Sequence, residues 1–127
     1  MLSTPPSKHT LVSRLLERAH TEPGRKAILT SREAVTYGEL ARRVVSATSE
    51  QRSNGVGPGD RVVLAASGTA AFVYGYLATH LLGAVAVPLA PDTPPARRDY
   101  VIDRVQPRVA YSAQPFEHEA TGPAHAI

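Results

Sequence analysis

The sequence predicts an α/β fold in which a mostly parallel sheet is flanked by helices. Two short apolar runs, residues 61–66 and 85–87, carry this prediction, because helix-compatible residues 70–82 fill the interval between them. A strand, a helix and a second strand in this order form the βαβ unit of parallel sheets. The apolar side chains are mainly Val, Leu, Ile and Ala, which is typical of strands buried on both faces.

Composition excludes several classes of protein. A chain of 127 residues with 43% hydrophobic and 20% charged residues suits one globular domain with a core. The net charge of +3 comes from scattered arginines without interleaved aromatics, which disfavours nucleic-acid binding. The absence of cysteine excludes disulfides and thiolate metal sites. No signal peptide or membrane span is evident in the sequence, so we expect a cytoplasmic location.

The N-terminal part of the chain predicts a helix followed by two short strands. Thr10 can cap a helix over 11–20, and Glu22-Pro23-Gly24 ends it. Residues 27–30 and 34–36 then have the pattern of strands separated by a polar turn. The helix is expected to place three leucines on its apolar face (Leu11, Leu15 and Leu16).

A second helix is predicted from Thr36-Tyr37-Gly38-Glu39, which has the spacing of a capping box. This helix should run to about Arg52, and Asn54-Gly55 supplies a left-handed stop. Because Gln51 and Asn54 are polar, we expect its end to pack weakly or to face solvent. Its inner stripe is expected to contain four apolar residues (Leu40, Val44, Val45 and Ala47).

The C-terminal part predicts an extended loop, a helix and a strand after residues 85–87. A proline cluster forces the loop, and Pro95 suits the first turn of a helix running to about Val105. Pro107 ends that helix, and residues 109–111 form a short strand. From Ser112 onward the chain is polar and without pattern, so 112–127 is interpreted as a tail or a cut linker.

Two glycine-containing segments invite comparison with phosphate loops. Gly55, Gly57 and Gly59 stand after a helix and before a strand, the reverse of the order that a phosphate loop requires, so we interpret them as a turn. Ser67-Gly68-Thr69 does stand between a strand and a helix, but no lysine accompanies it. The only lysines, Lys8 and Lys26, are far away in sequence. Helix capping is therefore the favoured role of this turn.

The remaining polar residues are interpreted structurally. Asp60 is expected to satisfy N–H groups of the glycine turn or to pair with Arg61, and Asp99 to favour a helix dipole near a helix start. Asp92 and Asp99 flank the proline loop without forming a carboxylate pair, and His80 is expected at a buried edge. The histidines show no metal-ligand spacing. We therefore assign no catalytic, cofactor-binding or metal-binding residue.

Several of these segments, in this order, resemble the start of the adenylate-forming superfamily of acyl-CoA synthetases, peptide-synthetase adenylation domains and luciferases. The resemblance covers residues 10–111, between a flexible N-terminus over 1–9 and the tail. The sequence differs from the family's pattern at Gln51 and Asn54, where leucine is usual, and at Ser67-Gly68, where an asparagine is common. The matching segments lie in sequence order (Glu22–Leu29, Thr36–Leu40, Gly55–Val62, Gly83–Leu89, Pro91–Pro94 and Pro107–Ala110).

The resemblance implies the N-terminal fragment of an ATP-dependent ligase, which converts a carboxylate and ATP to an acyl-AMP and then transfers the acyl group to CoA or a carrier thiol. The family's lysine-containing phosphate loop, adenine segment, ribose-binding aspartate and C-terminal lysine match nothing here. The fragment is therefore expected to be inactive alone, with ATP and magnesium bound by the complete enzyme and the remainder of the ligase as its partner. Two alternatives stay open: an interaction module of a split ligase, or a small unrelated nucleotide-binding protein.

Overall fold

The computed structural model describes residues 11–66, 69–112 and 124–126. The chain divides into two compact units, Met1–Arg43 and Val44–Ile127, and each is described by itself. The flexible segment predicted for residues 1–9 lies outside the described residues, as do Thr10 and most of the predicted tail. The predicted domain boundaries therefore stay predictions.

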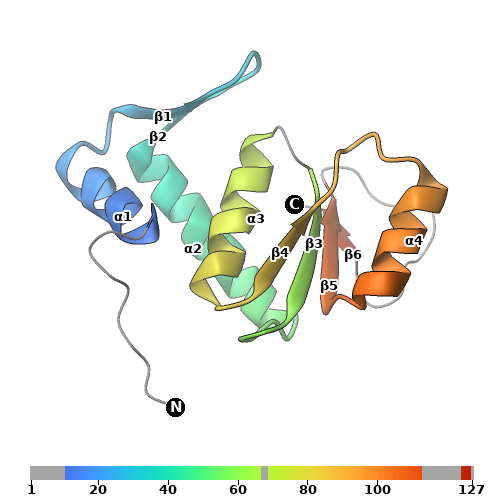
Figure 1. Ribbon diagram of the computed structural model, residues 1–127. Helices are drawn as coiled ribbons and strands as arrows, with labels where there is room; N and C mark the ends of the chain where they lie inside the picture. The colour runs from blue at the N-terminus through green and yellow to red at the C-terminus, as the bar shows by residue number, and fades with distance from the viewer. Residues whose placement is uncertain (1–10, 67–68, 113–123, 127) are drawn as a thin grey trace. The chain divides into compact units, whose positions relative to one another are not determined.

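The first unit contains helix α1 (Leu11–Thr21), strands β1 (Lys26–Leu29) and β2 (Ala34–Thr36), and the start of helix α2 (Tyr37–Ser53). The two strands pair antiparallel, with Lys26 opposite Thr36, so they form a hairpin (Figure 1). The Gly38 amide donates to the Pro23 carbonyl at 2.9 Å. A Cβ at residue 38 would lie 3.2 Å from that same oxygen, which explains why glycine follows Thr36-Tyr37.

The buried face of α1 differs from the predicted one. Val12 and Leu15 are buried, whereas Leu11 is 60% exposed and Leu16 52% exposed. Residues 12 and 15 stand one turn apart on the same face, and Leu11 and Leu16 lie at opposite edges of that stripe. The prediction grouped Leu11, Leu15 and Leu16 on the apolar face; only Leu15 of these is buried, because the buried stripe is centred on Val12 and Leu15.

The second unit is built on a sheet with the strand order β4-β3-β5-β6. All neighbouring strands are parallel, and Arg61 lies opposite Val85, which confirms the predicted βαβ unit (Figure 1). The tripeptide Ala124–Ala126 pairs with β5 although its sequence shows no strand pattern. The elements follow as β3 (Arg61–Ala65), α3 (Ala70–Leu81), β4 (Val85–Pro88), α4 (Pro95–Val105), β5 (Val109–Ser112) and β6 (Ala124–Ala126).

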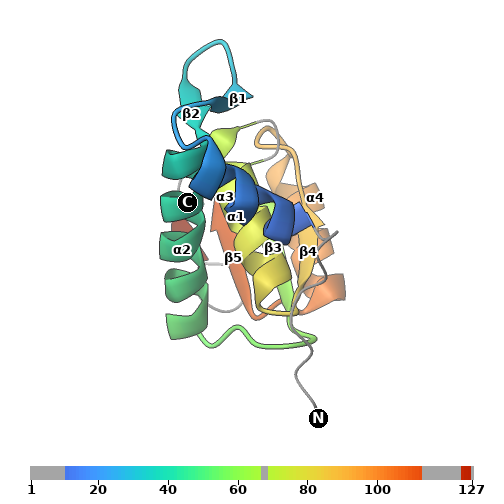
Figure 2. The same cartoon turned by 90° about the vertical axis from the view of Figure 1, so that its left-hand side faces the viewer.

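Helices cover both faces of this sheet, as Figures 1 and 2 show for α3 and α4. On one face Val62 and Leu64 form a core with Val109 and Tyr111, against which Phe72 of α3 packs. On the other face a cluster joins strand residues to α4 (Val63, Ala110 and Ile102). Alternation along β3 thus buries successive side chains against opposite helices, which accounts for its unbroken apolar sequence.

The start of α2 agrees with the predicted capping box in its threonine half. The Thr36 hydroxyl accepts a hydrogen bond from the Glu39 amide at 3.2 Å, and the Glu39 carboxylate pairs with Arg43 at 3.4 Å. Leu40 and Val44 are buried as predicted. Val45 is 64% exposed, so its assignment to the inner stripe was wrong.

One residue near the end of α2, Gln51, is buried, contrary to prediction. Gln51 is 2% exposed; its Nε2 donates to the Gly75 carbonyl at 3.1 Å and its Oε1 accepts from the Thr79 hydroxyl at 3.0 Å. The Thr79 hydroxyl also lies 2.7 Å from the Gly75 carbonyl, so its proton is shared between two acceptors. A buried amide is compatible with a core when its donor and acceptor are both used. These contacts join α2 to α3.

We predict that Gln51→Ala destabilises the chain by about 2 kcal/mol, because it leaves a cavity and removes both hydrogen bonds of the side-chain amide. Thr79→Val should interact with this change, with a coupling of about 1 kcal/mol in a double-mutant cycle. Urea unfolding monitored by circular dichroism measures both quantities. Glu50→Ala on the exposed side of the same helix is the control. Additive effects of the Gln51 and Thr79 substitutions would contradict the account.

Candidate functional site

The second unit has two candidate sites, one at each end of the parallel strands. In parallel sheets ligands bind beyond the carboxyl ends of the strands. The turn from β3 into α3 lies at that end, and Thr69 is its described residue, since Ser67 and Gly68 lie outside the described part. The second place is a hollow near the amino ends of β3 and β5.

Thr69 acts as the N-cap of α3. Its hydroxyl accepts a hydrogen bond from the Phe72 amide at 3.1 Å and donates to the Ala66 carbonyl at 2.6 Å. The residue has extended backbone angles, as an N-cap requires. The single hydroxyl proton is therefore engaged in the turn. This geometry confirms the predicted capping role of Thr69.

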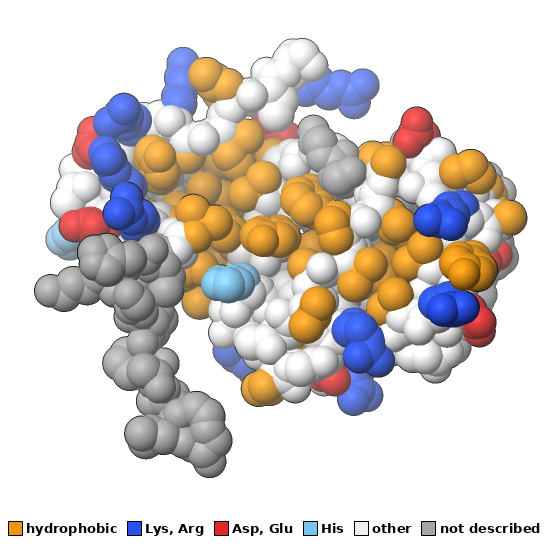
Figure 3. All heavy atoms as spheres, viewed as in Figure 1, with side chains coloured by type: hydrophobic (Ala, Val, Ile, Leu, Met, Phe, Trp, Pro, Cys, Tyr) orange, Lys and Arg blue, Asp and Glu red, His pale blue; other side chains and the backbone are white. Residues whose placement is uncertain are grey.

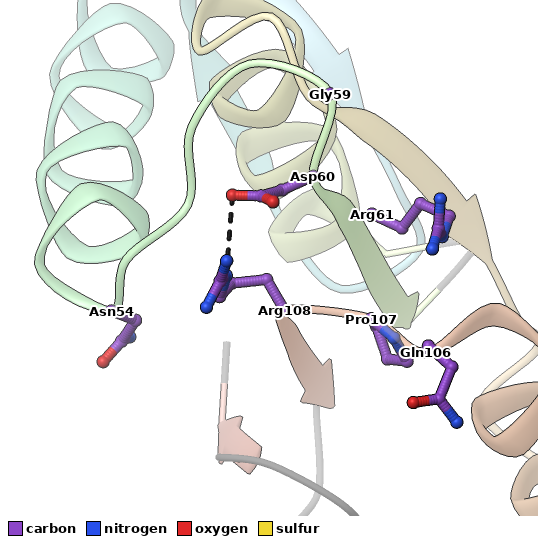
Figure 4. A pocket seen from close by; sticks show the side chains of 7 residues that line it. All are labelled: Asn54, Gly59, Asp60, Arg61, Gln106, Pro107 and Arg108. Carbon is purple, nitrogen blue, oxygen red and sulfur yellow. Dashed lines mark ion pairs between the residues drawn. The ribbon is translucent and has the colours of Figure 1, made fainter.

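The hollow has a volume of about 450 Å³ and a largely polar lining (Figure 4). It lies next to the amino ends of β3 and β5, opposite to the end at which parallel sheets hold ligands. Its lining comes from the end of α2, the glycine turn, the start of β3 and the segment before β5 (Asn54, Gly59, Asp60, Arg61, Gln106, Pro107 and Arg108).

Asp60 organises the turn beside this hollow. Its carboxylate accepts a hydrogen bond from the Gly57 amide at 2.8 Å, which confirms its predicted role in the glycine turn. Gly55 and Gly59 have φ values of +90° and +82°, which only glycine adopts easily, so the turn interpretation of the glycines is also confirmed. The ion-pair partner of Asp60 is Arg108, at 3.6 Å.

Of the two roles expected for Asp60, the alternative of pairing with Arg61 is not the one that the structure shows. The Arg61 Nε instead donates to the Val105 carbonyl at 2.6 Å, at the C-terminal end of α4. Cations are favourable there because the last carbonyls of a helix lack intrahelical donors. Figure 4 shows Arg61 and Arg108 pointing in different directions, so the two guanidinium groups do not converge on one ligand. The side chains that line the hollow thus connect elements of the fold, and they do not form a catalytic acid and base facing one ligand.

Asn54 and Tyr111 connect α2 to the sheet next to this hollow. The Asn54 Nδ2 donates to the Tyr111 hydroxyl at 2.8 Å, and Tyr111 is 3% exposed. The end of α2 was expected to pack weakly or to face solvent, so this contact of the half-buried Asn54 is a second correction there. Burial raises the pKa of Tyr111 above the ordinary value of 10.0, the Asn54 hydrogen bond opposes this shift, and the charge of Glu50 adds to it.

A raised phenol pKa predicts a loss of stability at high pH. Above about pH 10 ionisation of Tyr111 stabilises the unfolded chain. The folded chain keeps the phenol neutral until its own higher pKa is reached, so the unfolded state is favoured. Stability from this residue is therefore present below that pH and falls as the pH rises through it. Tyr111→Phe should flatten this fall in urea unfolding between about pH 8 and pH 11. An unchanged slope would contradict the account, and Tyr100→Phe on exposed α4 is the control.

Other residues considered from sequence do not gather into a site. His80 is exposed, so its predicted place at a buried edge was wrong. Asp99 lies in the second turn of α4, not in the first, so its predicted interaction with the helix dipole was wrong as well. Asp92 is exposed in the proline loop. Among the described residues no three His, Asp or Glu side chains come close enough to hold a metal ion.

Sequence reasoning missed the residues that organise this region. Gln51, Asn54 and Tyr111 were judged singly, and the polar pair was interpreted as a weak helix end. The available signal was the position of Gln51 two helical turns after the buried Val44, on the same face of α2.

No described helix is long and apolar enough to cross a membrane.

Comparison with known proteins agrees with the fold. The chain is 37% identical over 92 residues to phenyloxazoline synthase MbtB of Mycobacterium sp. (strain MCS), covering 72% of this chain and 8% of that protein. It is 35% identical over 92 residues to 3-hydroxybenzoate–CoA ligase of Aromatoleum sp. (strain CIB), covering 72% and 18%. These curated relatives are thus several times longer than the matched segment.

Solved structures give the same result. IdnL1 superposes with a TM-score of 0.80 at 30% identity, covering 98% of this chain and 27% of that one. The N-terminal subdomain of Klebsiella oxytoca NpsA superposes with a TM-score of 0.75 at 22% identity over 91% of this chain, a likeness of fold alone. The profile of the family described as AMP-binding enzyme matches residues 15–126. The chain therefore belongs to the AMP-binding, adenylate-forming family, as the N-terminal region of an adenylation domain.

Proposed function

We propose that this chain is the opening segment of an acid-adenylating ligase and that it supplies scaffold to that enzyme without supplying reacting groups. The complete enzyme would join an acyl or aryl carboxylate to ATP, forming acyl-AMP and releasing pyrophosphate. It would then transfer the acyl group to the thiol of CoA or of a carrier protein, releasing AMP. The family match over residues 15–126 is the observation that carries this proposal.

The names of the relatives support this reaction class. They include a hydroxybenzoate–CoA ligase and a feruloyl-CoA synthase, and also subunits of gramicidin synthase. Relatives named for CoA and relatives named as peptide-synthase subunits both resemble the chain, so the proposal covers CoA and carrier-bound acceptors alike. The acid itself would be chosen by residues outside these 127.

The described side chains suit a scaffold. The β3–α3 turn contributes a threonine hydroxyl that is engaged in capping, and the described residues contain no cluster of metal ligands. Stabilising the transferred phosphates requires positive charge and magnesium at the reacting centre. ATP and magnesium would therefore be held by the remainder of the ligase. The same observations disfavour the unrelated nucleotide-binding alternative.

The free edge of the sheet supports the remainder of the ligase as the partner. In the described part of the chain β4 ends the sheet, and Tyr76, Leu81 and Val85 near it are 40%, 42% and 51% exposed. Figure 3 shows hydrophobic side chains gathered on this face beside α3 and β4. Exposed apolar surface at an unpaired edge is typical of a surface that another part of the protein covers.

The backbone of β4 restricts how that edge is covered. Val85 donates its N–H to the Asp60 carbonyl at 2.7 Å and Leu89 donates to the Leu64 carbonyl at 2.9 Å, so the alternate residues 86 and 88 face the free edge. Pro88 has no N–H to donate. A long added strand is therefore disfavoured, and we infer that side-chain packing dominates the cover.

We predict that the purified 127-residue chain catalyses no ATP–pyrophosphate exchange with benzoate, 3-hydroxybenzoate or ferulate, because its sequence places no lysine beside the β3–α3 turn to neutralise the reacting phosphates. Magnesium-ATP should also leave its melting temperature unchanged. Radiolabelled pyrophosphate exchange and thermal unfolding measure the two outcomes.

Thr69→Ala and Thr93→Ala form a matched pair for this experiment. Each hydroxyl donates to the carbonyl three residues earlier at 2.6 Å, but only Thr69 lies at the β3–α3 turn. Exchange activity that Thr69→Ala removes and Thr93→Ala keeps would overturn the scaffold proposal in favour of a nucleotide site at this turn.

A further inference from the structure

The outer side of α4 carries an exposed tyrosine between two arginines. Arg97 Cζ lies 5.6 Å from the centroid of the Tyr100 ring, and Arg104 Cζ lies 5.7 Å from it. Tyr100 is 52% exposed. We propose that this Arg97–Tyr100–Arg104 face is a docking site for an acidic segment of a protein, a role separate from the proposed ligase function.

The helix holds these three side chains together. Residues spaced by three and four lie on one side of a helix, so Arg97 approaches the Tyr100 ring from the turn before it and Arg104 from the turn after it. Contacts between guanidinium groups and the ring favour one arrangement of otherwise flexible side chains. A partner that binds this arrangement loses less side-chain entropy than one that must order free arginines.

The other side of α4 is fixed on the sheet. Ile102 is 2% exposed and packs with Val63 and Ala110. The end of the helix is held by the Arg61 Nε, which donates to the Val105 carbonyl at 2.6 Å. The face that carries Tyr100 is therefore presented to solvent on a rigid element, which precise recognition requires.

Charge and residue type select the occupant. Two guanidinium groups favour carboxylates, to which each can donate two parallel hydrogen bonds, and Tyr100 can donate a third from its hydroxyl. Tyrosine and arginine are also enriched among the residues that contribute most of the binding energy at protein interfaces. In Figure 3 basic and hydrophobic side chains lie together over α4, at the right of the molecule.

The acidic residues of α4 favour a narrow protein segment over a nucleic acid. Asp99 and Asp103 are also exposed on α4; Asp103 stands three residues after Tyr100 and borders the ring on the side away from Arg97. A helix with carboxylates on one side can lie along Arg97 and Arg104, which are seven residues apart on the side of Tyr100 away from Asp103. A nucleic acid presents phosphates over a wider area and would approach both aspartates, and its bases would find Tyr100 already in contact with arginine.

The test uses a fluorescein-labelled helical peptide of alanine and glutamate, titrated with the chain at low salt and followed by anisotropy. We expect saturable binding that Arg97→Ala/Arg104→Ala weakens about tenfold, equivalent to about 1.4 kcal/mol. Tyr100→Ala should also weaken it, and Tyr100→Phe less so, because phenylalanine keeps the ring and loses only the hydroxyl. The control Arg14→Ala/Arg52→Ala removes the same charge from two exposed positions elsewhere.

Three results would overturn the proposal. These are an absence of peptide binding, an equal loss in the control variant, and tighter binding of a single-stranded oligonucleotide of the same charge than of the peptide. Circular dichroism of each variant establishes that it is folded. The charge-reversed variant Arg97→Glu/Arg104→Glu gives an independent reading, because it should lose the glutamate peptide and bind a matching lysine peptide.

Discussion

The buried amide of Gln51 is the constraint on which the second unit depends. Burying an amide without hydrogen-bond partners destabilises the fold by more than one hydrogen bond typically stabilises it. The neighbours of a buried amide must therefore supply a donor and an acceptor. The Thr79 hydroxyl and the Gly75 carbonyl meet this requirement, and both belong to α3. Gly75 also leaves the space that Leu64 and the amide occupy, since a Cβ there would lie 3.1 Å from a Leu64 methyl carbon. A polar residue thus fixes the position of α2 on α3.

The segment after Gln51 carries this constraint to the sheet. Asn54 binds the Tyr111 hydroxyl of β5, Gly55 turns the chain with its positive φ, and Asp60 closes the glycine turn before β3 begins. Each contact is specific to the residue type present, which is a physical reason for the series of glycines and polar residues between α2 and β3. The hollow among these residues is a consequence of the turn and of the Asp60–Arg108 ion pair, and its groups serve the fold.

Elements with strong local signals were predictable, and those decided by tertiary contacts were not. The βαβ unit followed from two apolar runs and a helical interval, and the left-handed turn followed from its glycines. The position of Gln51 relative to Val44 indicates its burial, but the hydrogen-bond partners of Gln51 and Asn54 could not be predicted, because tertiary contacts decide them. Thr79 and Tyr111, the partners, lie far away in sequence. Strand β6 was missed because Ala-His-Ala has no pattern, and the face of α1 was misplaced because Leu11 and Leu16 flank the narrow buried stripe of Val12 and Leu15.

The central claim is that this chain is an exchangeable scaffold, and a chimera tests it most directly. Residues 11–112 would replace the matching segment of the Aromatoleum 3-hydroxybenzoate–CoA ligase, to which the chain is 35% identical. Formation of 3-hydroxybenzoyl-adenylate by the purified chimera would be measured by mass spectrometry. The account predicts that the folded chimera forms this adenylate and prefers the same acid as its host. A folded chimera that forms no adenylate, or that prefers a different acid, would contradict the claim that these residues provide scaffold without chemistry.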